Sequence, residues 1–271
     1  MVELKKHPDI IYKYRNWIDI NHKNTLLKNQ IYLSSPKDFN DPLDCRIPIN
    51  YSYLQTDEQI DRYVNSIISK QHDEFIKRRI NIEIESANLK QRIINDPNGF
   101  QKWYENIFFG EMDIHYGIYS MSEEWDSLLM WAHYANNHQG ICIGFWQKKL
   151  LELNRFIMGS VFYPPDNVFP DITPFDDDET KILIKQTNTK SNEWQYEREY
   201  RLTTLYYPLK PTVIDRTYTL SDDFIAEIII GMRATEETRT EIIQIAKDKK
   251  VNVFEIRQKS FKFEIERIQL L

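Results

Sequence analysis

The sequence predicts an α+β fold whose core is a mixed, largely antiparallel sheet. Short runs rich in β-branched and aromatic residues occur toward both ends of the chain. Residues 54–109 instead carry apolar side chains at helical spacing. Strands and helices do not alternate regularly, as they would in a parallel α/β sheet. We therefore expect one domain spanning residues 1–271, with a helical insertion at about residues 54–109.

Composition narrows the class of protein. The chain has 271 residues, of which 41% are hydrophobic and 28% charged, as is usual for a globular protein with a sizeable core. Its two cysteines are too few for a disulfide scaffold or a cysteine-based zinc site. The net charge of −6 argues against nonspecific nucleic-acid binding. Neither a signal peptide nor a membrane-length apolar run is present, so we expect a cytoplasmic protein with no membrane partner.

The first elements are predicted to be a strand, a short helix and a second strand. Residues 10–15 (IIYKYR) alternate aromatic and basic side chains, which is typical of a strand. Residues 16–28 carry apolar side chains with an approximately helical period. Residues 30–35 (QIYLSS) predict a second strand, which Pro36 ends because proline lacks a backbone donor.

A turn-rich loop follows, and two of its polar side chains are pocket candidates. Phe39 and Leu43 are apolar residues within it, which predicts that the loop packs against the core. Asn40 and Asp41 are the pocket candidates of this loop. Asp41 and Asp44 can either bind a cation or organise the loop, and we favour the second interpretation.

A strand, a helix and a strand are predicted after the helical insertion. Residues 116–121 form the first strand of this unit, and Ser122 precedes two glutamates as an N-cap would. The helix is expected over residues 123–137. Gly140 is suited to end it, and residues 141–145 (ICIGF) return as a strand.

Three side chains of this helical segment lie on one face at spacings of three and four residues, namely Trp131, Tyr134 and His138. Trp131 and Tyr134 can stack on a planar ligand ring. For Trp131 we favour a place in the core, whereas the hydroxyl of Tyr134 favours a pocket. His138 is either a base in that pocket or a helix-end histidine that contacts local carbonyls, and we favour the latter.

The second half of the chain is predicted to return to strands. Residues 162–180 are rich in proline and aspartate and predict a surface connection, with a mobile lid as the alternative. The remaining elements are a short helix at 181–187, strands at 212–218 and 224–230, a helix at 235–249, and strands at 251–257 and 261–270.

Residues 190–205 (KSNEWQYEREYRLTTL) carry the most distinctive pattern in the chain. As a strand they place apolar residues on one face and Glu197, Glu199 and Arg201 on the other. Two carboxylates at this spacing lie roughly 6–7 Å apart, which raises at least one pKa unless a cation such as Arg201 compensates. The alternatives are a helix with Glu–Arg pairs and an edge strand with a surface ion pair.

Several blocks of the sequence resemble one family. Residues 12–15, 31–44, 120–145 and 194–202 resemble, in this order, the signature blocks of the bacterial domain-of-unknown-function family 2971. This resemblance implies no activity.

The chain also resembles the ADP-ribosyltransferase fold, in the class that carries Arg, Ser and Glu on successive strands. The matching residues are Arg15, Ser34 and the pair Glu197 and Glu199, although Ser-Ser-Pro replaces the usual Ser-Thr-Ser. The resemblance implies that NAD is the substrate, that Arg15 binds its phosphates and that Ser34 holds the ribose or the first strand. Glu199 would stabilise the positive charge formed when the nicotinamide–ribose bond breaks, and Glu197 would activate the acceptor.

Our hypothesis from the sequence is an NAD-dependent ADP-ribosyltransferase-like enzyme, acting as a toxin or phage-defence effector. The alternatives are a hydrolase of NAD or another nucleotide in the same pocket, and a noncatalytic module that binds a ligand or protein. We expect no metal, since His133 and His138 lack the HExxH pattern. The macromolecular acceptor is not indicated. Further pocket candidates are Asn40, Asp41, His138 and Arg201.

Overall fold

The computed structural model describes residues 8–271, and its core is an eight-stranded sheet. The strands run in the order β10-β9-β8-β4-β1-β3-β6-β5. Their bounds are β1 Ile10–Arg15, β3 Tyr116–Ser122, β4 Ile141–Trp146, β5 Ile157–Ser160, β6 Glu199–Leu205, β8 Ile225–Ile230, β9 Asn252–Gln258 and β10 Ile265–Gln269. Among the described strands of this sheet, β8 and β9 form the one parallel pair. The predicted α+β class with a mixed, largely antiparallel sheet is confirmed.

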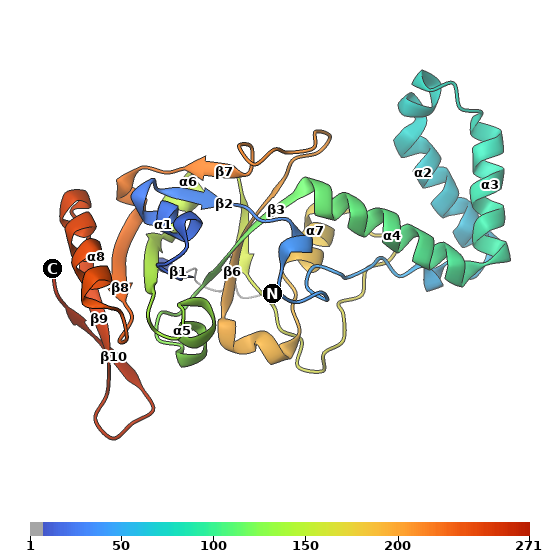
Figure 1. Cartoon of the computed structure of the whole chain (residues 1–271). Coiled ribbons are helices and arrows are strands. Elements are labelled where there is room, and N and C mark those ends of the chain that lie inside the picture. Colours follow the sequence, from blue (N-terminus) through green and yellow to red (C-terminus); the bar gives the residue numbers. More distant parts are fainter. Residues whose placement is uncertain (1–7) are drawn as a thin grey trace.

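A two-stranded sheet lies beside the main one (Figure 1) and joins two distant parts of the chain. In it β2 (Gln30–Tyr32) pairs antiparallel with β7 (Thr217–Thr219). Ser34 then pairs with Ile118 of β3 through backbone hydrogen bonds of 2.9 Å. This bridge fixes the loop that follows β2 against the main sheet.

Helices cover both faces of the main sheet. Alternate residues of β8 point to opposite faces, so Ile228 packs under α8 (Glu236–Lys249) while Ile229 packs in the cluster that contains Trp131 of α5 (Leu128–Tyr134). The other short helices are α1 Ile20–Leu27, α6 Gln147–Glu152 and α7 Glu179–Thr187, with 3₁₀ turns η1 Pro36–Asp38, η2 Tyr51–Tyr53, η3 Asn192–Glu197 and η4 Asp222–Phe224.

The segment predicted as a helical insertion forms α2 (Asp57–Lys77), α3 (Ile82–Asn95) and α4 (Pro97–His115). Thr56, Asn81 and Asp96 cap their N-termini by accepting backbone hydrogen bonds. The helices enclose a separate apolar cluster around Phe100. Helix α4 leads from β3 to the α2–α3 hairpin, which lies at the far end of the molecule from α8 (Figure 1). None of the helices in residues 8–271 is long and apolar enough to cross a membrane.

Two predicted elements are wrong in detail. Residues 190–205 are not one strand: η3 occupies their first half, and Arg198 adopts a left-handed conformation before β6 begins. Backbone contacts explain this turn, since Glu123 N donates to Arg198 O at 2.8 Å and Ser122 Oγ donates to Glu197 O at 2.8 Å. Ser122 belongs to β3, and the N-cap of the following helix is Ser127.

The remaining differences lie in short elements. The strand predicted over 212–218 is shorter than expected, since only β7 (Thr217–Thr219) forms there. The prediction has no counterpart of β5 or α6. Leu43, predicted to pin its loop, is 65% exposed. Asp44 and Cys45 are buried in its place, because Asp44 binds an arginine inside the protein.

Candidate functional site

A cavity of about 800 Å³ lies between β1, β3 and the segments that surround the start of β6. Residues from at least five separate parts of the chain line it. They include Lys13 and Arg15 of β1, His22 of α1, Ser34, Asn40 and Asp44 after β2, Tyr119 of β3, Tyr134 of α5, and Lys190, Glu197 and Glu199. Its volume falls within the usual range for small-molecule sites.

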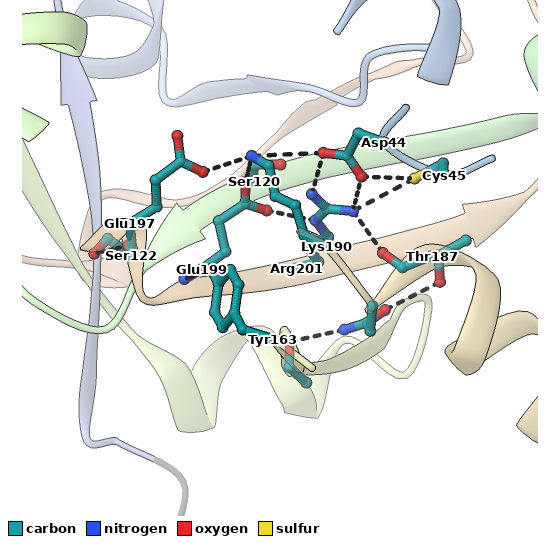
Figure 2. A network of polar contacts seen from close by, with 12 residues as sticks. Asp44, Cys45, Ser120, Ser122, Tyr163, Thr187, Lys190, Glu197, Glu199 and Arg201 are labelled. Atoms are coloured by element: carbon teal, nitrogen blue, oxygen red, sulfur yellow. Dashed lines mark hydrogen bonds and ion pairs between the residues drawn. The ribbon is translucent and has the colours of Figure 1, made fainter. Parts of the chain in front are cut away.

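On one side of the cavity, five charged side chains form a buried ionic cluster. We call Asp44, Lys190, Glu197, Glu199 and Arg201 the carboxylate cluster; their side chains are at most 7% exposed. Lys190 Nζ lies 2.5 Å from Glu197 Oε2, 2.8 Å from Glu199 Oε1 and 3.5 Å from Asp44 Oδ2. Figure 2 shows these contacts converging on the lysine.

Arg201 closes the cluster behind Glu199. Its two terminal nitrogens donate to the two oxygens of Asp44 at 2.8 and 2.6 Å, and its Nε donates to Glu199 Oε2. It also donates to the Thr187 carbonyl at 2.7 Å (Figure 2). A fully buried arginine is therefore satisfied by two carboxylates and one carbonyl, in the bidentate geometry that favours such pairs.

The local backbone explains how Glu197 and Glu199 meet. In β6, alternation places Glu199 and Arg201 on one face while Tyr200 and Leu202 enter the core on the other. Glu197 is not on this strand, but the turn at Arg198 brings its carboxylate to the same lysine that binds Glu199.

The two glutamates have pKa values displaced in opposite directions. Burial, the Glu199 charge and a hydrogen bond to Glu199 raise the pKa of Glu197 to about 7, against the lowering effect of Lys190. Burial acts to raise the pKa of Glu199 as well, but Arg201 and Lys190 hold it well below its usual range. Near neutral pH, therefore, Glu197 exchanges a proton while Glu199 remains ionised.

Tyr134 connects the carboxylate cluster to the cavity. Its hydroxyl donates to Glu197 Oε1 at 2.5 Å and accepts from Asn40 Nδ2 at 3.3 Å. Burial and the Glu197 charge raise the pKa of Tyr134 above its ordinary value, so the phenol stays protonated at neutral pH and continues to donate.

On the other side of the cavity, Lys13 and Arg15 lack carboxylate partners among residues 8–271. We call Lys13, Arg15 and His22 the cationic wall after these two basic side chains; burial and Arg15 lower the pKa of His22, which therefore contributes a neutral imidazole. Lys13 Nζ donates to the Ser120 carbonyl and lies 4.8 Å from the centre of the Tyr119 ring. Arg15 Nη2 contacts the Tyr119 hydroxyl at 3.4 Å, whereas Arg15 Nε and His22 Nδ1 are buried without a hydrogen-bond partner among residues 8–271. Such atoms are costly unless a ligand or a water molecule satisfies them.

Six of the predicted site residues line this one cavity: Arg15, Ser34, Asn40, Tyr134, Glu197 and Glu199. Arg201 lies behind Glu199 and is fully buried, so it supports the site without facing the cavity. The prediction that Trp131 binds a cofactor is wrong, and the preference for a core position is correct. Trp131 is 0% exposed, and its indole N–H donates to the Trp125 carbonyl at 2.7 Å.

Asp41 and His138 also lie apart from the cavity lining. Asp41 Oδ1 accepts from Leu43 N at 2.9 Å, so it organises its loop, as we favoured. The His138 ring stacks beside Trp131, with ring centroids 6.2 Å apart, on the side of α5 that packs into the core. Neither residue can contribute directly to binding in the cavity.

Sequence reasoning missed Lys13, Asp44 and Lys190 as site residues. Lys13 had a detectable signal, because it lies two residues before Arg15 and must share its face of the strand. Lys190 had none, because the η3 turn brings it to the glutamates. Within residues 8–271 no group of three or more His, Cys, Asp or Glu side chains is placed to hold a metal.

Fold and site together define an α+β protein with a buried carboxylate cluster that opens into a cavity with a cationic wall. The family model described as "Protein of unknown function (DUF2971)" matches residues 130–202, which include Tyr134, Lys190, Glu197, Glu199 and Arg201. The predicted resemblance to this family is thereby confirmed. No curated protein matches the chain, and no solved structure does. The resemblance to ADP-ribosyltransferases therefore has no support from these comparisons.

Proposed function

We propose that the cavity binds a phosphate-bearing nucleotide, NAD in the first instance, and that the protein cleaves its nicotinamide–ribose bond as an ADP-ribosyltransferase-like enzyme. One observation carries this proposal. Two adjacent carboxylates, one ionised and one with a pKa of about 7, line the same cavity as Lys13 and Arg15. Paired carboxylates with divergent pKa values are typical of acid–base sites.

The cationic wall supports binding of an anionic substrate. The planar guanidinium of Arg15 suits the phosphate oxygens of a dinucleotide, and its Nε is free to donate. Ser34 lines the cavity beside β3 and offers a hydroxyl that can hydrogen-bond a ribose.

The carboxylate cluster supports the chemical step. Departure of nicotinamide leaves positive charge on the ribose, which a nearby ionised carboxylate stabilises. With all five members charged, the cluster holds three carboxylates and two cations, and hence an excess of negative charge. Glu197, with a pKa of about 7, can accept the proton of the incoming nucleophile. Tyr134 holds its carboxylate in place.

The acceptor is the point at which a second candidate function arises. The Glu197 side chain is only 2% exposed, a position that favours a small acceptor such as water over a protein side chain. In that case the same residues hydrolyse NAD. Either activity in a bacterial cytoplasm consumes NAD, which fits a toxin or phage-defence effector.

The test is release of nicotinamide from NAD, measured chromatographically for the wild type, Glu197→Gln and Glu199→Gln. We expect both variants to lose activity by a factor of about 100 or more. Glu193→Gln, an exposed residue of the same turn, is the matched control and should keep full activity. Binding of NAD without any turnover by the wild type would support a noncatalytic module. A wild type that neither binds nor turns over NAD would overturn the proposal.

A further inference from the structure

We propose that Lys13 is a reactive amine that forms an imine with an anionic aldehyde or ketone bound in the cavity, with Arg15 and His22 holding its anionic group. This inference does not depend on NAD cleavage. It rests on the environment of Lys13 and on two unpartnered nitrogen atoms beside it.

Lys13 and Lys190 line the same cavity in contrasting environments. Lys190 lies within 3.5 Å of three carboxylates, Asp44, Glu197 and Glu199. None of the ion pairs among residues 8–271 includes Lys13, whose ammonium instead meets the Ser120 carbonyl and the face of Tyr119. No carboxylate within residues 8–271 therefore lies at ion-pair distance from Lys13.

The charged groups around Lys13 also favour its neutral form. Burial and then Arg15, its neighbour on β1, lower the pKa of Lys13 to about 7. Lys190 acts in the same direction, whereas Glu199 of β6 and Glu197 of η3 oppose it. About half of the Lys13 side chains are thus neutral at pH 7, compared with fewer than about one in a thousand for an exposed lysine. A desolvated lysine beside another cation is a known form of activated amine nucleophile.

The position of the anionic group follows from the same strand. Side chains two residues apart on one strand face are roughly 6–7 Å apart, so Arg15 lies a short molecule's length from Lys13. Arg15 Nε and His22 Nδ1 are both buried without a hydrogen-bond partner in the described part of the chain; Arg15 Nε can donate to an anion, and so can His22 Nδ1 in the tautomer that carries its proton there. The ligand class is therefore a small carbonyl compound that carries a phosphate or similar group.

The reaction balances without an oxidant or reductant. The lone pair of Lys13 Nζ forms a bond to the carbonyl carbon, and the carbonyl oxygen leaves as water with the two hydrogens that the amine loses. The product is a C=N bond, which water reverses. Ring-opened ADP-ribose, an aldehyde with two phosphates, is a member of this class if the proposed hydrolysis of NAD occurs.

Pyridoxal phosphate, an aldehyde with a phosphate, is a direct probe. The full-length protein is treated with it at a series of pH values, reduced with borohydride, digested and mapped by mass spectrometry. We expect Lys13 to be the principal labelled lysine, with labelling that rises around pH 7. Lys190, whose pKa its carboxylate partners raise, is the internal control and should remain unlabelled.

Variants test the two parts of the site separately. Arg15→Gln should lower Lys13 labelling roughly tenfold, the scale of one lost charged hydrogen bond. Pyridoxal without its phosphate measures the effect of Arg15 on the Lys13 pKa alone, so its labelling of Lys13 should fall less in Arg15→Gln than that of pyridoxal phosphate. Labelling of Lys13 at the level of exposed lysines, or independent of pH between 6 and 8, would overturn the proposal. The labelling of Lys13 and its pH dependence are measured on the wild type, so this test does not depend on the folding of any variant. It is also independent of NAD turnover.

Discussion

The two sides of the cavity contain the same kinds of side chain in opposite states of pairing. In the carboxylate cluster every cation has a carboxylate partner, and Arg201 is bound by both Asp44 and Glu199. In the cationic wall neither Lys13 nor Arg15 has a carboxylate partner among the described residues, nor does Arg15 Nε have any hydrogen-bond partner there. Pairing, rather than charge type, therefore separates the cations that the protein's own carboxylates neutralise from those whose charge is available to a ligand.

The largest expected effect is a loss of protein stability when a residue of the carboxylate cluster is replaced. Arg201→Met leaves Asp44 and Glu199 buried without their main partner, and this should lower the free energy of unfolding by about 3–5 kcal/mol. Arg15→Met, on the unpaired side, should change it by less than about 1 kcal/mol. Urea denaturation of both variants measures the difference. Equal losses would show that the two sides are not distinct.

A smaller effect concerns the pH dependence of catalysis. In the proposed reaction Glu197, with a pKa of about 7, is the base, so NAD turnover should rise as pH increases through 7. Glu197→Gln should lower turnover about 100-fold and remove this rise. Initial rates between pH 5.5 and 8.5 test the assignment. A variant that keeps the pH profile of the wild type would exclude Glu197 as the group that titrates.

The same glutamate should affect stability in a defined direction. Its pKa is raised from 4.5 to about 7 on folding, so the folded state binds the proton more tightly. Stability should therefore fall as pH rises from about 4.5 to about 7, with the effect complete above that window. Glu197→Gln should lack this component. Thermal melts at pH 4.5, 6 and 7.5 compare the two slopes, and a wild type that gains stability relative to the variant across this window would contradict the sign.

The smallest expected effect is that of Tyr134→Phe. The variant removes the hydroxyl between Glu197 and Asn40, the scale of a single hydrogen bond of about 1 kcal/mol. We expect turnover to fall several-fold with little change in melting temperature. A large loss of stability with unchanged NAD affinity would instead mean that Tyr134 supports the fold and does not contribute to binding.

Much of the fold could be predicted because local patterns decide it. The strand at 10–15 and the helix at 235–249 show their period and caps directly in the sequence. The turn at Arg198 could not be predicted, since contacts with Ser122, the last residue of β3, and with Glu123 just after it hold the turn. Tertiary contacts override local strand preference at such a position.

The candidate site was predictable in its residue types but not in its pairing. Arg15, Glu197 and Glu199 were found because their chemistry matches a known pattern, and they line one cavity. The partners that set their charge states, Lys190 and Asp44, lie on segments whose positions only the folded chain defines. Sequence reasoning thus located side chains that line one cavity without showing which of them are paired inside the protein.

The central claim is that the unpaired side chains of the cationic wall bind the anionic groups of a ligand. Calorimetric titration of ADP-ribose, which cannot release nicotinamide, tests this claim most directly. It should be performed on the wild type, Arg15→Gln and Arg198→Gln, the last being a partly exposed arginine outside the cavity lining. We predict that Arg15→Gln weakens binding by roughly 10–100-fold without lowering the melting temperature, and that Arg198→Gln binds like the wild type. An Arg15→Gln protein that binds as tightly as the wild type, or that binds weakly only because it is unfolded, would contradict the account.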